Sequence, residues 1–181
     1  MKKCLICESE IKPFISYGKM PIANGFIGKD NFKDEYFFDM EVAHCSECSM
    51  VQLIETPDRK LMFNENYAFF SGTSQRMKDH FLDFSKNIYK NIKSKTNPFV
   101  VEIGSNDGIM LRNFKEWGVR HLGIEPSENV AKVAMKNGIN TIVKFFDEKL
   151  ANQIVKDYGQ ADAFIAANVM CHIPYFHSIV E

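Results

Sequence analysis

The sequence contains no long apolar run, and none of its stretches approaches the roughly 18 residues that a membrane-spanning helix requires. It also has no excess of charge of either sign, because 22 Lys and Arg residues stand against 23 Asp and Glu residues. A basic surface for nucleic acid is therefore not expected. The N-terminus lacks the apolar stretch of a secretory signal peptide. These absences predict a cytoplasmic protein that binds neither a membrane nor nucleic acid.

Cysteine is also sparse, but four of the five cysteines form two C-x-x-C pairs, Cys4 with Cys7 and Cys45 with Cys48. Each pair can occupy one side of a tetrahedral zinc ion, so the two pairs supply four thiolates. A thioredoxin-type redox pair would need a strand before it and a helix after it, which Cys4 lacks. Buried or adventitious thiols are the other alternative. The spacing favours a structural zinc site, because four thiolates leave no open position for catalysis.

The zinc pairs depart from common zinc knuckles in two ways. The insertion between them, residues 8–44, is long, and Glu8 and Ser49 stand where a glycine often follows the second cysteine. Alternating or apolar residues predict strands at 38–42 and 50–54, whereas residues 20–24 read as an irregular loop. We therefore predict a β-rich zinc-binding domain over residues 1–60.

A second motif begins with a short apolar run, Phe99–Ile103, that suits a buried parallel strand. The run ends in a turn of small residues, Gly104–Gly108, and helical spacing resumes at Met110. A strand that passes through a tight turn into a helix presents backbone N–H groups to nucleotide-like ligands. Asn106 and Asp107 stand where dinucleotide-binding proteins have a second glycine. The turn therefore favours a single nucleoside, and hence S-adenosylmethionine over NAD.

The next apolar run, residues 121–124, ends in Glu125. An acidic residue at the tip of the second strand can accept both hydroxyls of a ribose, although a surface carboxylate after an ordinary turn is the alternative. A later run, residues 161–167, is followed by Asn168 and His172. Since parallel strands end at one edge of the sheet, these residues are expected on the same side as Glu125.

The whole second part alternates strands with helices, which predicts an α/β fold with a doubly wound parallel sheet. Ser127 and Asp147 are expected to begin two of the helices as N-caps. A connector over residues 61–97 carries an amphipathic helix at 76–93 and leads into the sheet domain, residues 98–181. The predicted core face of that helix consists of Met77, Phe81, Phe84, Ile88 and Ile92.

Three motifs together, Val101–Gly108, Leu122–Ser127 and Ala167–Pro174, resemble the S-adenosylmethionine-dependent C-methyltransferases that act on nucleotide-linked keto-deoxysugars. Members of that family carry an N-terminal zinc-binding domain before a Rossmann-like class I methyltransferase domain. The resemblance extends over nearly the whole chain and includes an aromatic-serine linker at residues 67–74. The motifs are specific in combination and weak singly.

The resemblance also implies roles for individual residues. Tyr67 and His172 are the catalytic candidates nearest the sugar, with His172 handling a proton or stabilising an enolate. Aromatic packing for Tyr67 and a backbone hydrogen bond for His172 are the alternatives. The implied cofactor-binding residues are Glu102, Gly104, Ser105, Asn106, Asp107, Gly108, Glu125, Pro126, Phe146 and Asn168.

The implied reaction is C-methylation of a nucleotide-linked 4-keto sugar through an enolate. The family's sheet has seven strands followed by a large C-terminal region, whereas this sequence predicts four strands. We therefore expect a fragment that needs the C-terminal region in cis, or a complementing chain. An O- or N-methyltransferase acting on another small acceptor is one alternative. A non-enzymatic zinc-ribbon interaction module with a degenerate nucleotide-binding fold is the other.

Overall fold

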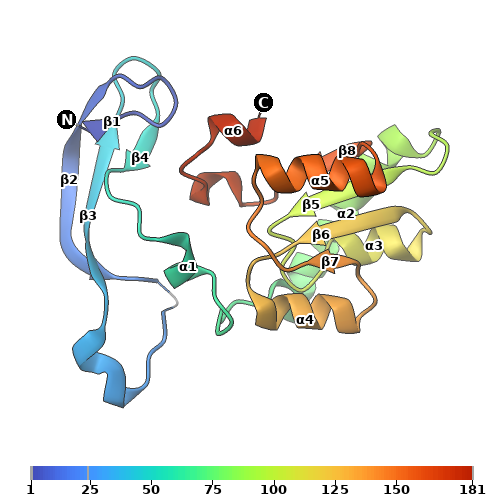
Figure 1. Ribbon diagram of the computed structural model, residues 1–181, viewed down its shortest axis with the longest axis horizontal. Coiled ribbons are helices and arrows are strands. Elements are labelled where there is room, and N and C mark those ends of the chain that lie inside the picture. The colour runs from blue at the N-terminus through green and yellow to red at the C-terminus, as the bar shows by residue number, and fades with distance from the viewer. Residues whose placement is uncertain (1, 24, 181) are drawn as a thin grey trace. The chain divides into compact units, whose positions relative to one another are not determined.

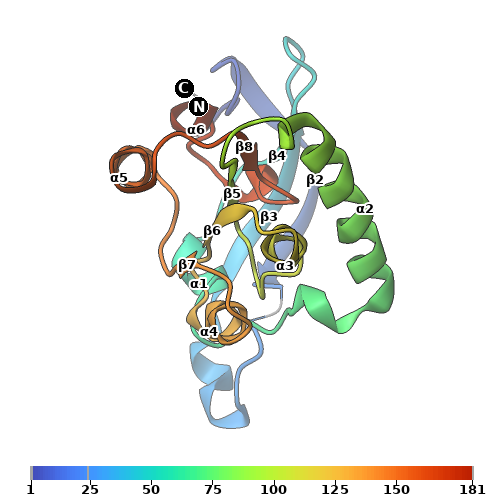
Figure 2. The same ribbon diagram turned by 90° about the vertical axis from the view of Figure 1, so that its right-hand side faces the viewer.

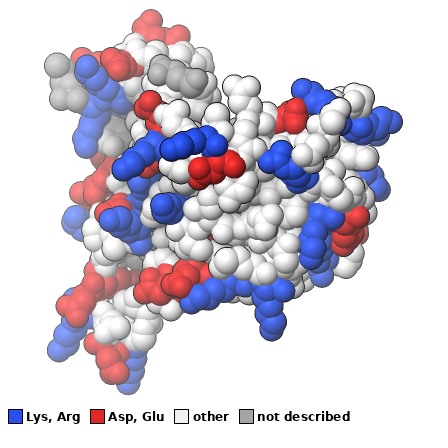
Figure 3. Space-filling model, turned by 45° about the vertical axis from the view of Figure 1, so that its right-hand side comes forward, with Lys and Arg blue, Asp and Glu red and all other residues white. Residues whose placement is uncertain are grey.

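The computed structural model describes residues 2–23 and 25–180. These residues form two compact units, one made of residues 2–63 with 172–180 and the other of residues 64–171 (Figure 1). Within the described ranges, none of the helices combines the length and apolar character of a membrane span. Basic and acidic side chains are interspersed on the face shown in Figure 3, in keeping with a net charge of -1.

The first unit is built on an antiparallel four-stranded sheet in the order β1-β2-β3-β4. Its strands are β1 (Lys2–Lys3), β2 (Glu10–Pro21), β3 (Phe37–His44) and β4 (Val51–Leu53). Its helical segments are η1 (Lys29–Asp34), α1 (Arg59–Met62) and α6 (His177–Val180). The predicted strands at 38–42 and 50–54 correspond to β3 and β4 (Figure 1).

The long strand β2 was not anticipated from the sequence. All but one of its residues are exposed, so buried and exposed residues do not alternate along it. It forms because it pairs with β3, and Met20 and Pro21 lie opposite Phe38 and Phe37. The expectation of an irregular loop is therefore wrong for Met20 and Pro21, and its last residue, Asn24, lies outside the described residues.

The second unit contains a parallel four-stranded sheet in the order β7-β6-β5-β8, which confirms the doubly wound arrangement. Its strands are β5 (Phe99–Ile103), β6 (Arg120–Ile124), β7 (Thr141–Ile142) and β8 (Ala163–Ile165). The outer strand β8 is shorter than the apolar run at residues 161–167, because it pairs along a short register with β5 alone. Ile103 lies opposite Ile124, so the residues that follow β5 and β6 emerge side by side.

Helices cover both faces of this parallel sheet. They are α2 (Gln75–Ile92), α3 (Leu111–Glu116), α4 (Glu128–Lys136) and α5 (Glu148–Tyr158). The short turn η2 (Ser71–Thr73) precedes α2, and the short turn η3 (Met170–His172) lies where the chain passes from the second unit to the first. Figure 2 shows α2 and α3 on one side of the strands and α5 on the other. Asp147 caps α5 as predicted, because its side chain accepts a hydrogen bond from Leu150 N at 2.8 Å. The apolar core on the α2 and α3 side includes Ile92, Val100, Met110, Leu111, Phe114, Ala134 and Ile139.

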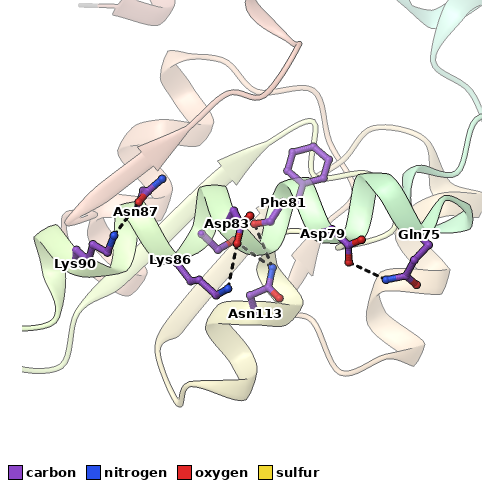
Figure 4. A network of polar contacts seen from close by, with 9 residues as sticks. Gln75, Asp79, Phe81, Asp83, Lys86, Asn87, Lys90 and Asn113 are labelled. Carbon is purple, nitrogen blue, oxygen red and sulfur yellow. Dashed lines mark hydrogen bonds and ion pairs between the residues drawn. The ribbon is translucent and has the colours of Figure 1, made fainter.

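The predicted core face of α2 is wrong at Phe84. That side chain is 41% exposed, whereas Ser85 is fully buried. Residues 81, 85, 88 and 92 follow one line along the helix, and position 84 lies to one side of it. The reason for a buried serine is polar, since Asn113 Nδ2 of α3 donates to Ser85 Oγ at 3.2 Å and also lies 3.4 Å from the Phe81 carbonyl (Figure 4).

We expect Asn113→Ala to lower the free energy of unfolding by about 1–3 kcal/mol, because it leaves the buried Ser85 hydroxyl without its partner. Urea denaturation measures this change. Lys86→Ala is the matched control, since Lys86 pairs with Asp83 at 3.0 Å on the exposed side of α2, the helix that carries Ser85 (Figure 4). Its effect should stay below about 1 kcal/mol. Equal effects of the two substitutions would show that the hydrogen bond between Asn113 of α3 and Ser85 of α2 does not stabilise the packing of these helices.

Candidate functional site

Four cysteine sulfurs converge in the first unit. The Sγ atoms of Cys4, Cys7, Cys45 and Cys48 all lie within 4.8 Å of one another. Cys4 Sγ is 3.5 Å from Cys48 Sγ, and Cys7 Sγ is 3.4 Å from Cys45 Sγ. A tetrahedral zinc ion with Zn–S bonds of about 2.3 Å requires sulfur separations of about 3.8 Å. The four thiolates therefore fit a structural zinc ion.

Each C-x-x-C pair forms the same tight turn. Glu8 N donates to the Cys4 carbonyl at 3.0 Å, and Ser49 N donates to the Cys45 carbonyl at 2.9 Å. Glu8 and Ser49 have φ angles of 60° and 62°, in the left-handed region that glycine occupies most easily. Glu8 and Ser49 thus adopt the left-handed backbone conformation that glycine often provides at these positions, at a conformational cost of roughly 1–2 kcal/mol each.

The zinc ligands differ in acidity without a metal. Contacts with the Ser9 hydroxyl and backbone lower the pKa of Cys7 to about 6. The Met50 N–H acts to lower the pKa of Cys48, but desolvation and the neighbouring sulfurs raise it to about 12. Four adjacent thiolates repel one another, so a bound cation is needed to keep all of them ionised.

Gln52 of β4 binds the backbone of the N-terminal segment that carries Cys4. Its side chain is 8% exposed, and its Oε1 accepts a hydrogen bond from Leu5 N at 2.9 Å while its Nε2 donates to the Lys3 carbonyl at 3.4 Å. This role was not predicted from the sequence, because Gln52 lies far along the chain from Lys3 and Leu5. Burying a polar side chain to satisfy distant backbone groups leaves no local pattern.

The second candidate site lies at the carboxyl ends of β5 and β6, where Glu125 binds the turn after β5. Its Oε2 accepts from Asn106 N at 2.9 Å and its Oε1 accepts from Ser127 N at 2.7 Å. Burial raises the pKa of Glu125, although both backbone N–H groups act to lower it. Each carboxylate oxygen keeps a further lone pair, so the group can also accept ribose hydroxyls.

Ser127 is the N-cap residue of α4, as predicted, although its hydroxyl makes no capping hydrogen bond. Glu125 instead binds the Ser127 backbone N–H at the start of the helix. The carboxylate from the strand end therefore replaces the serine side chain at the helix N-terminus.

Glu102, the fourth residue of β5, is a second buried carboxyl group beside this turn. It is 3% exposed, and burial together with the nearby Glu125 and Asp107 raises its pKa well above the ordinary range. Desolvation favours the neutral, protonated form of a carboxyl group over the charged form.

Gly104 allows the segment after β8 to approach the turn. Its φ angle is 61°, and a Cβ atom at this position would lie 2.4 Å from Cγ2 of Val169. Asn168, the residue before Val169, is exposed and has a φ angle of 55°. The end of β8 is thus brought to the Gly104 turn, as the parallel topology predicted.

The connector before α2 also lies against this turn. The Tyr67 carbonyl accepts from Asn129 Nδ2 at 2.7 Å, and burial followed by the charge of Glu125 raises the pKa of the Tyr67 hydroxyl. Asn106 and Asp107 contact the backbone of residues 69–72. Asn129 was not among the predicted site residues, because its partner is a backbone carbonyl 62 positions away.

The predicted site residues are therefore distributed over both units. Tyr67, Glu102, the Gly104–Gly108 turn and Glu125 come together in the second unit, where Phe146 lies 5.3 Å from Phe164 of β8 between ring centroids. His172 groups with the first unit, and its ring lies edge-on to Phe63 at 5.9 Å. Pro126 stands between Glu125 and the start of α4.

Two protein families match the chain in succession. A zinc-binding-domain family matches residues 4–63, and a methyltransferase-domain family matches residues 69–181, more than half of the chain. The chain is 26% identical over 181 residues to C-methyltransferase NovU of Streptomyces niveus, covering 99% of this chain and 43% of NovU. The chain therefore spans less than half the length of that relative.

Solved structures offer weaker likenesses. Magnesium protoporphyrin IX methyltransferase ChlM from Synechocystis, solved with bound SAM, has a TM-score of 0.39 at 15% identity, over 55% of this chain and 49% of ChlM. The plantazolicin methyltransferase BpumL, in complex with a substrate analogue and SAH, has a TM-score of 0.43 at 17% identity, over 60% of this chain and 42% of BpumL.

Proposed function

Because the chain belongs to the methyltransferases and carries a zinc-binding domain ahead of its methyltransferase domain, we propose that the protein methylates a carbon atom of a nucleotide-linked 4-keto-deoxysugar. The supporting observation is the combination of the four-thiolate cluster with a buried acidic residue beside the glycine turn. The match to a C-methyltransferase along nearly the whole chain favours carbon over oxygen or nitrogen as the methylated atom.

S-adenosylmethionine supplies an electrophilic methyl group when it is bound. We propose that Glu125 holds the ribose hydroxyls and that the Gly104–Gly108 turn lets the backbone approach the nucleoside. Asn168 would lie toward the methionine portion, at the end of β8. Pro126 and Phe146 complete the proposed nucleoside surroundings.

A ketone activates the neighbouring C–H bond, so a base could take that proton and leave an enolate, whose carbon would accept the methyl group as its bond to sulfur breaks and S-adenosylhomocysteine leaves. The enolate oxygen needs a hydrogen-bond donor. A tyrosine hydroxyl is protonated at neutral pH, and burial raises the pKa of Tyr67 further, so Tyr67 can serve as that donor. His172 is proposed as a proton carrier, because a neutral imidazole has one nitrogen that can accept a proton and one that can donate it.

The zinc ion has a structural role in this proposal. Four cysteine ligands close its coordination sphere, so no position is open for the substrate. Because the chain spans less than half of its relative, we propose that the base for the keto sugar comes from beyond this chain, in cis or on a complementing chain. Residues 1–60, 61–97 and 98–181 remain our proposed division into zinc, connector and cofactor domains.

Calorimetric titration of the zinc-loaded chain with S-adenosylhomocysteine tests the cofactor assignment. We expect saturable binding with one site, and no binding of NAD in a parallel titration, because the turn lacks the glycine that accommodates a pyrophosphate. A chain that is folded by circular dichroism but binds NAD and not S-adenosylhomocysteine would contradict the assignment. With the complete protein, methyl transfer to oxygen or nitrogen instead of carbon would refute the proposed acceptor.

A further inference from the structure

The connector before α2 is held by side chains at four of its backbone groups. Asn106 accepts a hydrogen bond from Ser71 N at 2.9 Å and donates to the Phe69 carbonyl at 3.0 Å. Asp107 accepts from Gly72 N at 2.7 Å. With the bond from Asn129 to the Tyr67 carbonyl, these contacts fix both ends of a short segment, residues 67–72, to the unit's core.

The fit between this segment and the turn is close. A Cβ atom at Gly72 would lie 2.7 Å from Asp107 Oδ2, so any larger residue there would displace the carboxylate. Asn106 is itself held, because its backbone N–H donates to Glu125 and its side chain is 9% exposed. One residue thus links the connector directly to the carboxylate at the end of β6.

Unpartnered polar atoms gather around the same turn. Buried polar atoms in proteins are almost always hydrogen-bonded, so a group of exceptions requires an explanation. Within the described residues, the buried side-chain atoms without a partner include Glu102 Oε2, Ser105 Oγ, Asp107 Oδ1, Ser127 Oγ and Asn129 Oδ1. All five belong to the turn or to residues that adjoin it in the sheet and α4, which indicates a place for a polar ligand.

We propose that Asn106 and Asp107 are positioning residues that clamp residues 67–72 onto the glycine turn, and that the clamped segment forms one wall of the nucleoside site. This inference rests on the proposed function and refines it. Asn106 and Asp107 then act through the connector and not as direct cofactor ligands. Their contacts hold the connector backbone against the turn that Glu125 binds, where the nucleoside is expected to bind.

Amide hydrogen exchange measured by NMR on the free, zinc-loaded chain tests the clamp without any ligand. Asp107→Ala should raise the exchange rate of the Gly72 amide at least tenfold, since that N–H loses its acceptor. Asn106→Ala should do the same at Ser71. Asp107→Asn keeps one side-chain oxygen and should restore most of the protection at Gly72.

A double substitution tests the contact between Gly72 and Asp107. Gly72→Ala alone should weaken S-adenosylhomocysteine binding at least tenfold, because the new methyl group displaces the carboxylate. In the Asp107→Ala background the same change should have less than a threefold effect, since the obstructing carboxylate is gone. If Gly72→Ala weakened binding by the same factor in the wild-type and Asp107→Ala backgrounds, the proposed clamp would be wrong.

The wall is tested by titrating the same variants with S-adenosylhomocysteine. Asp107→Ala should weaken binding at least tenfold, with recovery in Asp107→Asn, whereas the control Asp157→Ala, on exposed α5, should change nothing. If Asp107→Ala bound S-adenosylhomocysteine with unaltered affinity, the connector would not form a wall of the nucleoside site. Protected amides at Ser71 and Gly72 in a wild-type chain that binds no S-adenosylhomocysteine would count against the proposed function and not against the clamp.

Discussion

Removal of zinc is expected to unfold the zinc-binding sheet up to about residue 55 and to leave the second unit folded. The buried apolar cluster of the first unit consists of Cys4, Ile11, Ala43 and Cys45, so half of it is zinc ligands. Several of its aromatic side chains are exposed, including Phe14, Tyr17 and Phe32. Metal binding contributes about 10–16 kcal/mol to folding in small zinc domains. Without it, this sheet has too little buried surface to stay folded.

Two spectroscopic signals distinguish unfolding of the first unit from unfolding of the second. Trp117, the one tryptophan of the sequence, packs against Phe114 and Tyr89 in the second unit. Complete chelation should therefore remove strand signal from the circular dichroism spectrum while Trp117 fluorescence stays native. Cys45→Ser should lose zinc, whereas the control Cys171→Ser, which changes an exposed cysteine outside the cluster, should retain one zinc per chain. An unchanged circular dichroism spectrum after chelation would refute the prediction.

Glu125→Ala is expected to weaken S-adenosylhomocysteine binding at least about 100-fold, equivalent to roughly 2.7 kcal/mol. Two effects combine. The proposed acceptor for the ribose hydroxyls is lost, and the backbone N–H groups of Asn106 and Ser127 lose the carboxylate that accepts their hydrogen bonds. Each buried donor left unpaired costs about 1–3 kcal/mol, so the unfolding free energy should also fall. Calorimetric titration gives the affinity and urea denaturation gives the stability.

The matched control is Glu128→Ala, three positions along the chain in the first turn of α4. Glu128 is exposed and pairs with Lys132 at 2.8 Å on the helix surface. We expect its removal to leave the affinity for S-adenosylhomocysteine unchanged and to alter stability by less than about 1 kcal/mol. Equal affinities of Glu125→Ala and the wild-type chain would remove Glu125 from the proposed site.

The sequence by itself determined the features that depend on local pattern. The two C-x-x-C pairs named all four zinc ligands, because a metal site uses few residue types at short spacings. The apolar run Phe99–Ile103 and the following turn located the central strand. Glu125 was placed at the tip of β6 because consecutive parallel strands end at one edge. Asp147 was recognised as a cap from its position before a helical repeat.

Tertiary structure decided the features that depend on distant partners. Strand β2 buries only one of its residues and is held by its pairing with β3. Ser85 is buried in place of Phe84 because Asn113, on another helix, binds it.

The same holds for the clamp on the connector, where side chains at Asn106 and Asp107 bind backbone groups 35 positions away. Any residue has a backbone N–H to offer except proline, so such contacts impose no residue type on the partner and leave no motif. Only the folded chain shows which side chain meets which backbone.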